Sequence, residues 1–590
     1  MAQETPLYKK GGGFLLAETP AGEMFTPEEF SEEQRMFAQA ADEFMEKEVL
    51  PHNDRIEQQD FDLLRDLMKK AGALGLLAVD IPEKYGGLGL DKVSSMLIAE
   101  RMAKQGSFSV TWGAHTGIGT LPIVFFGTEE QRQKYLPGLA SAEIIGAYAL
   151  TEPGAGTDAM NIKTRAVLSD DGKYYILNGN KQFITNAAIA DLFTVFAKVD
   201  GEKFTAFLVE RDTPGLELGA EEKKLGIKGS STRSLTFTNV RVPVENVVGE
   251  IGKGHHIAFG ILNIGRYKLG VGAVGAAKEA LKVAVNYAKE RVQFGRPIAD
   301  FGLIQEKLAH MATRIFVTET MAYRLAGLLD EAMAGLDPNA PDYTQKSWNA
   351  VAEYAVECSV LKVYGSEMLD YVVDETMQIF GGYGYTQEYP AERYYRDSRI
   401  NRIFEGTNEI NRILIPGMLM RRALKGQIPL IPMAAKTAKE TLTLMPTMMP
   451  RPEGPFSNEK FALGMAKRIA LTLAAVAADK FKENIRNEQE VLAGLADIVT
   501  EVYAIESILL RALKSGDALM ASIVEMYTYE AMKRIELRAY EILPYMSEGD
   551  ELRTLISTVR KLVRPFTPPN LIQKRREIAR KVIDLGRYPF

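Results

Sequence analysis

The sequence has little of what disulfides, metal centres and membrane spans require. Of its 590 residues only one is a cysteine, Cys358, so an internal disulfide cannot form and a cysteine-clustered metal site is not expected. The five histidines are scattered, and the adjacent pair His255 and His256 lies beside a lysine rather than beside carboxylates. We therefore predict no metal site. No uninterrupted apolar run reaches the roughly eighteen residues that a membrane-spanning helix needs.

The chain also lacks an excess of positive charge. Its formal net charge is -6, with 71 Lys and Arg against 77 Asp and Glu, which argues against a nucleic-acid partner. The N-terminal segment is acidic and has no apolar core of signal-peptide length, so export is not expected and a cytoplasmic location is favoured. A chain of this length is expected to form about three or four domains.

The spacing of apolar residues predicts a mostly α protein with a central β domain. Helical spacing runs through residues 30–147 and returns over 253–425. Between them, residues 148–252 carry short β-branched and aromatic runs separated by Asp-Gly, Asn-Gly and Pro-Gly turns, which predict a β domain. In the second helical region, long helices are expected over 255–291, 303–334 and 343–379.

The two ends of the chain have their own patterns. Residues 1–29 are interrupted by glycines and predict an arm laid over the surface. A Pro- and Met-rich stretch, 426–457, is typical of a linker. It precedes a further helical block, 458–590, which we interpret as an added domain.

One carboxylate in the second helical region is a candidate for chemistry. Glu405 lies between Phe404 and Gly406, where the backbone can turn tightly. A carboxyl group among apolar neighbours loses solvation of its charged form, which raises its pKa and suits it to proton abstraction near neutral pH. Glu405 is therefore a candidate general base. Taken alone, the segment also fits an exposed glutamate in a turn before a helix, with Thr407 near the helix start.

A glycine motif at Gly270, Gly272 and Gly275 matches the G-x-G-x-x-G fingerprint of dinucleotide-binding folds. That fingerprint needs a preceding strand, whereas Ile257, Ile261 and Ile264 lead into it with helical spacing. We reject a dinucleotide fold and expect the glycines to allow close helix crossing.

Two long segments resemble the signatures of one enzyme family. Residues 147–158 (Ala-Tyr-Ala-Leu-Thr-Glu-Pro-Gly-Ala-Gly-Thr-Asp) predict a loop whose free N–H groups and hydroxyls can receive a flavin edge and a pyrophosphate. Residues 378–388 (Gln-Ile-Phe-Gly-Gly-Tyr-Gly-Tyr-Thr-Gln-Glu) are followed by Arg393 and Asp397. These segments resemble the first and second signatures of the acyl-CoA dehydrogenases, and the resemblance extends over residues 30–425.

The resemblance implies FAD as cofactor and three domains, helical, β-barrel and helical-bundle. Phe183 would lie on the isoalloxazine, where many relatives carry tryptophan, and Thr185 would hydrogen-bond flavin N5. The other positions that the resemblance assigns to FAD are Tyr148, Leu150, Thr151, Gly156, Thr157, Thr407 and Glu409. Four more, Arg291, Phe294, Gln378 and Gly382, would reach the FAD of a neighbouring subunit, so that the site is completed only in an oligomer.

The implied activity is α,β-dehydrogenation of a fatty acyl-CoA to the trans-2-enoyl-CoA, with electrons passed to an electron-transfer flavoprotein. Glu405 matches the catalytic base of the family, whereas some relatives carry the base at the position of Gly265. Arg266 and Gly406 are expected at the substrate. Two alternatives stay open: an acyl-CoA oxidase that uses dioxygen, and a catalytically idle relative that serves as a scaffold.

The added block resembles the very-long-chain branch of the family, in which extra helices cover the face that smaller members use to form tetramers. A homodimer is therefore expected, with helices over 460–481, 488–513 and 518–543. The 431–450 segment combines many apolar residues with Lys436 and Lys439. Packing on the protein's own surface and peripheral contact with a membrane both explain this composition.

A final pattern concerns acyl-chain length. Ser109, Gly113 and Gly117 recur every four residues in a helix-like stretch, so they share one face. Close helix packing and an open groove both explain the spacing. Medium-chain relatives carry bulky polar side chains at the positions matching Ser109 and Gly113. Their absence here would deepen the acyl cavity, and since each buried methylene contributes roughly 0.8 kcal/mol, we expect a preference for about C14 to C18 chains.

Overall fold

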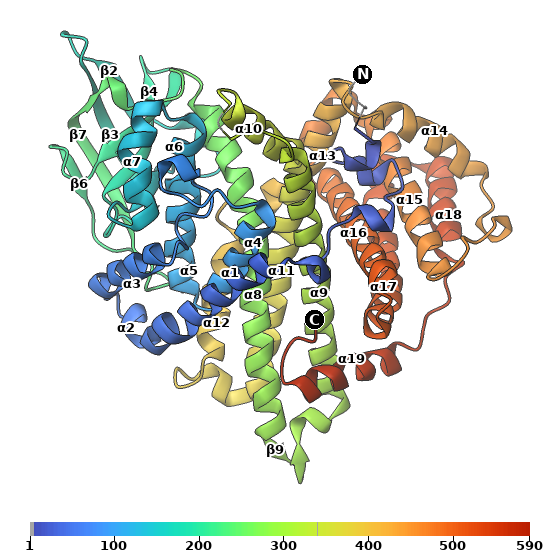
Figure 1. The fold of residues 1–590 in the computed structure, drawn as a ribbon. Helices are drawn as coiled ribbons and strands as arrows, with labels where there is room; N and C mark the ends of the chain where they lie inside the picture. Colours follow the sequence, from blue (N-terminus) through green and yellow to red (C-terminus); the bar gives the residue numbers. More distant parts are fainter. Residues whose placement is uncertain (1–4, 339) are drawn as a thin grey trace.

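The computed structural model describes residues 5–338 and 340–590. Long central helices separate a β domain on one side from a second block of helices on the other (Figure 1). The prediction of a mostly α protein with a central β domain and an added C-terminal helical block is confirmed.

The N-terminal region packs seven helices beside the β domain (Figure 1). Several begin at side-chain caps: Ser31 accepts from Gln34 N, and Asp91 accepts from Ser94 N. The helix that carries the Ser109 and Gly113 stretch continues directly into a π-helical turn, Ala114–Gly119. The helices are α1 Glu32–Phe44, α2 Asn53–Glu57, α3 Phe61–Ala73, α4 Lys92–Met102, α5 Gly106–Gly113, α6 Leu121–Phe126 and α7 Glu129–Ser141.

The β domain is one sheet with the strand order β6-β7-β3-β2-β4-β5-β8, and β1 pairs in parallel with β4. Its own core includes Leu177, Phe193 and Phe207, all fully buried. Gln182 N donates to Thr151 O at 2.9 Å, so the loop after β1 lies along the end of β3. The strands are β1 Gly146–Ala149, β2 Arg165–Leu168, β3 Tyr174–Thr185, β4 Leu192–Val199, β5 Lys203–Glu210, β6 Leu216–Leu218, β7 Thr232–Pro243 and β8 Val247–Val248.

The central helices run the length of the molecule (Figure 1). The helix expected over 343–379 is two helices that meet at Tyr354. A short hairpin, β9 Val292–Gln293 and β10 Arg296–Pro297, follows the first long helix and lies at the far end of the central helices from the β domain. The helices are α8 Gly254–Glu290, α9 Gly302–Met333, α10 Tyr343–Glu353, α11 Ala355–Phe380, α12 Ala391–Ser398 and α13 Asn408–Leu424.

The glycine motif lies inside the continuous helix α8, as expected from its spacing. A Cβ added at Gly270 would lie 2.4 Å from the side chain of Leu361 on α11, and one added at Gly275 would lie 1.9 Å from Glu100 O on α4. The glycines therefore allow α8 to cross two neighbouring helices closely.

The added block consists of α14 Leu430–Thr443, α15 Ser457–Phe481, α16 Gln489–Ser515, α17 Ala518–Met546, α18 Gly549–Val563 and α19 Leu571–Leu585. The three helices expected here are confirmed as α15, α16 and α17. The stretch expected as a linker contains α14, because its residues Leu430, Ala434 and Thr441 are buried and provide a packing face.

Buried ion pairs join the added block to the rest of the chain. Arg511 on α16 is almost fully buried and contacts Glu319 on α9 and Glu28 near the N-terminus, each at 2.7 Å. Arg324 on α9 contacts Glu506 on α16 at 2.6 Å. Because removing one member leaves a buried charge without its partner, these pairs favour one arrangement of the added block.

The expectation of an N-terminal arm on the surface is wrong for its central part. Residues 11–16 are buried, with Phe14 packed against Tyr503 of α16 at a ring-centroid distance of 4.7 Å. Gly12 N donates to Glu357 Oε1 at 2.7 Å. The arm is clamped between the central helices and the added block, which its glycine-rich composition did not indicate.

One segment of the described chain, Ser457–Asn487, is long and apolar enough to cross a membrane, with a mean hydropathy of 1.5. Of its most apolar window, 56% is buried inside the protein. Helix α15 also packs against α14, α16 and α17. Its apolar side chains are therefore accounted for by the core of the added block.

Candidate active site

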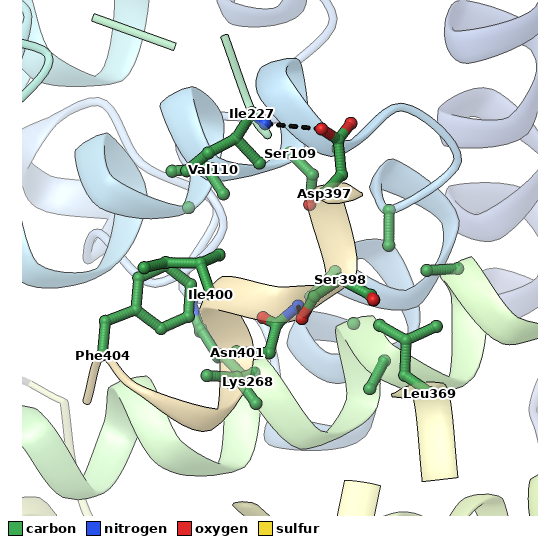
Figure 2. A pocket seen from close by; sticks show the side chains of 18 of the residues that line it. Ser109, Val110, Ile227, Lys268, Leu369, Asp397, Ser398, Ile400, Asn401 and Phe404 are labelled. Atoms are coloured by element: carbon green, nitrogen blue, oxygen red, sulfur yellow. Dashed lines mark hydrogen bonds between the residues drawn. The ribbon is translucent and has the colours of Figure 1, made fainter. Parts of the chain in front are cut away.

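A cavity of about 190 Å³ lies between the N-terminal helices, the β domain and the central helices. Its walls come from α5 and the π-helical turn after it, from α8 and α11, and from the chain between α12 and α13. Figure 2 shows Val110, Ile227, Leu369, Ile400 and Phe404 around the opening. The lining also includes five residues with predicted roles in or beside the site, Ser109, Gly113, Thr185, Gly265 and Glu405.

Asp397 ties one wall of the cavity to the loop that follows the β6 strand. One carboxyl oxygen accepts a hydrogen bond from Ile227 N, drawn as a dashed line in Figure 2. Burial raises the pKa of Asp397 to about 6, although that hydrogen bond and Arg396 oppose the shift. The contact fixes the position of the β domain relative to α12.

Glu405 lies in the loop that leads into α13, in a left-handed conformation with φ of 59°. The side chain is half-buried, but its Oε2 is sealed from solvent and has no hydrogen-bond partner in the described chain. Burial raises the pKa of Glu405 to about 7, and the cations Arg266 and Lys362 limit the rise. The structure therefore provides a carboxyl group that changes charge near neutral pH and faces an apolar cavity.

The backbone of the Glu405 turn is held from three sides. Arg266 Nε on α8 donates to Glu405 O at 3.3 Å, and Lys362 Nζ on α11 donates to Gly406 O at 2.7 Å. Asn411 on α13 donates to Gly406 O at 2.8 Å. Gly406 itself has φ of 79°, a conformation that favours glycine. The side chain of Thr407 accepts from Ile410 N and caps α13, so its observed role is at the helix start.

Gly265 lies directly against the candidate base. A Cβ added there would lie 2.5 Å from Glu405 Oε2. The two positions at which the resemblance places a base thus share one location in space. Glycine at 265 leaves that location to Glu405.

The candidate flavin residues of the β domain form one edge beside the cavity. Phe183 is 61% exposed, with φ of 58°, and Thr185, two residues later on β3, lines the cavity. Thr151 lies along β3 through its hydrogen bond with Gln182. Gly156 and Thr157 are exposed in the loop after β1, whereas Tyr148 and Leu150 on and after β1 are buried.

A buried lysine supports this edge from behind. Lys181 is fully buried, two residues before Phe183, and donates to Leu150 O at 3.1 Å and Glu152 Oε1 at 2.9 Å. Because Glu152 also accepts from Thr164 N, the ion pair joins the loop after β1 to β2 and β3.

Four predicted flavin residues do not reach this cavity. Arg291 and Phe294 belong to the β9–β10 hairpin, and Phe294 is 95% exposed. Gln378 and Gly382, at the end of α11, are exposed too. Arg291 lies 5.4 Å from the ring centre of Tyr383, which links the hairpin to the end of α11. Glu409, in the first turn of α13, is exposed and does not line the cavity.

No group of three or more His, Cys, Asp or Glu side chains that could hold a metal ion is present in residues 5–338 and 340–590. The sole cysteine, Cys358, is buried and free.

Comparison with family models covers most of the chain. The N-terminal, middle and C-terminal domain models of the acyl-CoA dehydrogenases match residues 31–143, 147–240 and 252–419. A further C-terminal domain model of the same family matches residues 465–561. The chain belongs to the acyl-CoA dehydrogenase family.

The similarity extends to whole relatives of this family. A probable acyl-CoA dehydrogenase of Bacillus subtilis is 51% identical over 595 residues, covering all of both chains. The human mitochondrial very long-chain specific acyl-CoA dehydrogenase is 37% identical, covering 83% of this chain and 76% of its own. This enzyme thus shares its added block with a full-length bacterial relative.

Solved structures give the same result. The acyl-CoA dehydrogenase of Bacillus anthracis complexed with FAD has a TM-score of 0.95 at 51% identity, covering 98% of this chain and 99% of its own. Butyryl-CoA dehydrogenase of Megasphaera elsdenii has a TM-score of 0.60 at 38% identity, with 66% of this chain and 99% of its own covered. About a third of this enzyme therefore has no counterpart in the shorter butyryl-CoA dehydrogenase.

Sequence reasoning missed two side chains of this acyl-CoA dehydrogenase that hold the Glu405 turn, Lys362 and Asn411. Asn411 is fully buried in α13, and Lys362 is fully buried in α11. The signal available in the sequence is a lysine between Leu361 and Val363 in an apolar helical stretch, where a charge needs a specific partner.

Proposed function

We propose that this acyl-CoA dehydrogenase binds FAD and oxidises long-chain fatty acyl-CoA to trans-2-enoyl-CoA, with Glu405 as the base and an electron-transfer flavoprotein as the acceptor. The observation that carries the proposal is the buried carboxyl group of Glu405. Its Oε2 has no hydrogen-bond partner in the described chain, and Glu405 lines an apolar cavity that Thr185 also lines. Proton removal from carbon next to a thioester needs such a carboxylate, close to the acyl chain and out of contact with water.

The residues of the β domain fit FAD. Phe183 has a left-handed backbone conformation at a register shift within β3, and its ring is 61% exposed, so its face is available for stacking against a flavin ring. Added Cβ atoms at Gly154 and Gly156 would meet nothing within 4 Å, so the loop leaves room for a pyrophosphate beside its N–H groups. The Bacillus anthracis relative, complexed with FAD, shares this fold at 51% identity. When bound, FAD supplies the acceptor for the hydride from the β-carbon.

The protein's part in the reaction is to remove the α-proton and to stabilise the charge that develops on the thioester oxygen. The Glu405 carboxylate takes the proton, since its buried Oε2 is not engaged by a hydrogen bond from any described group. No hydrogen bond from the Glu405 peptide N–H to a described residue is found, so this donor is free to bind the thioester oxygen. Arg266 and Gly406 keep the turn in place, with Arg266 donating to Glu405 O.

The long-chain preference rests on the wall formed by α5. Ser109, Gly113 and Gly117 line the cavity, and added Cβ atoms at the two glycines would meet nothing within 4 Å. The glycines therefore open space instead of serving a close helix contact. The very long-chain specific relatives, 37% identical in the human protein, support this preference.

Peripheral membrane contact is a further part of the proposal. One face of α14 is packed, but its residues Ile431 and Leu442 are exposed, as are Met445 and Met448 in the segment that follows it, the last at 81%. An apolar surface beside lysine side chains fits a lipid interface. Flotation with anionic liposomes should decrease for the Met445→Glu, Met448→Glu protein, while equal flotation of variant and wild type would exclude this surface.

Anaerobic titration with an acyl-CoA series tests cofactor, reaction and substrate class together. The purified protein should be yellow, and C14 to C18 substrates should bleach the flavin more efficiently than short ones. If the bleached protein, once exposed to air, consumes oxygen rapidly without any flavoprotein acceptor, it is an oxidase instead. A colourless protein that does not take up FAD would contradict the proposal.

A further inference from the structure

Lys362 is a buried cation to which the proposed reaction has so far given no role. It lies on α11, and its side chain is fully buried. Its Nζ donates to Gly406 O and to Asn408 Oδ1, each at 2.7 Å. Both acceptors are neutral, and within the described chain no carboxylate forms an ion pair with this lysine. By contrast, the buried Lys181 has Glu152 as a partner at 2.9 Å.

A buried ammonium without a paired carboxylate is costly, so the surrounding structure must supply compensation. Burial lowers the pKa of Lys362 to about 8, and the charge of Glu405 is the largest influence in the opposite direction. The interaction is reciprocal, because Lys362 is one of the two cations that lower the pKa of Glu405. The lysine and the candidate base therefore stabilise each other's charged forms across the turn.

We propose that Lys362 is a positioning residue for the base: it holds the left-handed turn of Glu405 and Gly406 through two hydrogen bonds, and its charge favours the ionised form of Glu405. The inference rests on the proposed function, since it assumes that Glu405 removes a proton. Lys362 would act on the backbone of the turn that carries the base, without contacting the substrate or the cofactor.

The other charged groups around the pair do not replace Lys362. Arg266 of α8 faces Glu405 from the other helix, but it is also bound to Asn263 Oδ1 at 2.8 Å. Tyr148 of β1 is a neutral neighbour of Glu405, because burial raises its pKa far above the usual range. Around Lys362 the acidic groups are Glu367 of α11 and Glu409 of α13. Glu367 is already bound by Arg412, at 2.7 Å.

Three substitutions separate the charge of Lys362 from its hydrogen bonds. Lys362→Met removes both, Lys362→Gln keeps a donor without charge, and Lys362→Arg keeps charge and donors. For the Met and Gln variants, the acid limb of kcat/KM should move up by about one pH unit, because Glu405 loses a nearby cation. The high-pH plateau of kcat should fall about tenfold only in the Met variant, because its turn is no longer held. The Arg variant should keep the wild-type acid limb.

Lys467→Met is the matched control. Lys467 is a mostly buried lysine of the added block, paired with Glu506 at 2.6 Å, and its loss should leave the acid limb in place. If Lys362→Met does not fold, comparison of the acid limbs of the Gln and Arg variants still tests the effect of the charge. An acid limb unchanged in Lys362→Gln would overturn the inference. If Glu405→Gln retains normal turnover, it is the proposed function that fails, so the two failures are distinguishable.

Discussion

At the scale of single residues, opposing effects act on the carboxyl group of Glu405. Burial raises its pKa to about 7, while Arg266 and Lys362 prevent a larger rise. A base with this pKa is ionised for much of the time at neutral pH and still holds the abstracted proton well. A carboxylate paired directly with a cation would be a poor base. In the described chain Arg266 and Lys362 donate to the backbone oxygens of Glu405 and Gly406 instead of to the carboxylate.

The raised pKa predicts a pH-dependent stability difference for Glu405→Gln. In the unfolded chain the carboxyl group titrates near 4.5, and in the folded protein near 7. Between pH 4.5 and about pH 7 the unfolded chain loses the proton of Glu405 more readily than the folded protein does. The free energy of unfolding of the wild type therefore decreases over this range. The uncharged glutamine avoids this loss, so the variant should gain about 2–3 kcal/mol relative to wild type between pH 5 and pH 8.

Thermal or denaturant unfolding of both proteins at the two pH values measures this effect. The comparison isolates the one carboxyl group, since the other titrating groups are common to both. A stability difference that does not change with pH would show that Glu405 is ionised without cost in the folded state.

Single residues also show what a sequence can and cannot predict. Glu405, Phe183 and Thr185 stand in local motifs, so the sequence alone suggests their roles. Lys362 and Asn411 carry no motif, because their contacts with the turn arise only when α11 and α13 pack together. A sequence signature can therefore suggest roles for the residues within it, whereas contacts that arise only from packing of distant helices leave no local pattern.

At the scale of elements, the proposed long-chain preference depends on the wall formed by α5. Gly113→Glu should place a side chain in the acyl space, since an added Cβ there meets nothing within 4 Å. Displacing about four methylenes at roughly 0.8 kcal/mol each corresponds to a loss of about 10²-fold in kcat/KM for C16 relative to C8 substrate.

The matched control is Gly417→Glu, an exposed helical glycine on α13 with equally open space around it. It should leave the ratio of C16 to C8 efficiencies unchanged. If Gly113→Glu lowers the efficiency for all chain lengths equally, the α5 glycines serve packing and the argument for a long-chain preference fails.

Helices and other segments also differ in how well their structure can be predicted from their own sequence. Helix α8 follows from its own apolar spacing, and the glycines inside it mark helix crossings. The N-terminal arm and α14 differ from their expected loop structure, because glycine, proline and methionine content is typical of loops. Their structure depends on partners distant in sequence, such as Glu357 for Gly12, and no local pattern contains that information.

At the scale of the whole molecule, we propose a homodimer in which the exposed β9–β10 hairpin contacts the neighbouring subunit. Phe294 is 95% exposed in the single chain, so its ring is available for a contact with a second subunit. Phe294→Asp should therefore weaken dimerisation at least about tenfold and loosen FAD, without lowering the stability of the monomer. Sedimentation velocity and flavin content measure both effects.

Leu537→Asp is the control for this prediction, since Leu537 is 61% exposed on α17 of the added block. The added block is expected to limit assembly, so this change should leave the dimer intact. A wild-type tetramer, or dissociation caused by Leu537→Asp, would contradict the proposed arrangement.

The most direct test of the central claim is anaerobic flavin reduction by a C16 acyl-CoA in Glu405→Gln, followed by stopped-flow absorbance. The account predicts that the variant retains its yellow colour and binds the substrate, because glutamine keeps the shape of the side chain. Its flavin should bleach at least about 10³-fold more slowly than in the wild type, because no carboxylate accepts the α-proton. Bleaching at a rate close to that of the wild type would contradict the assignment of Glu405 as the base.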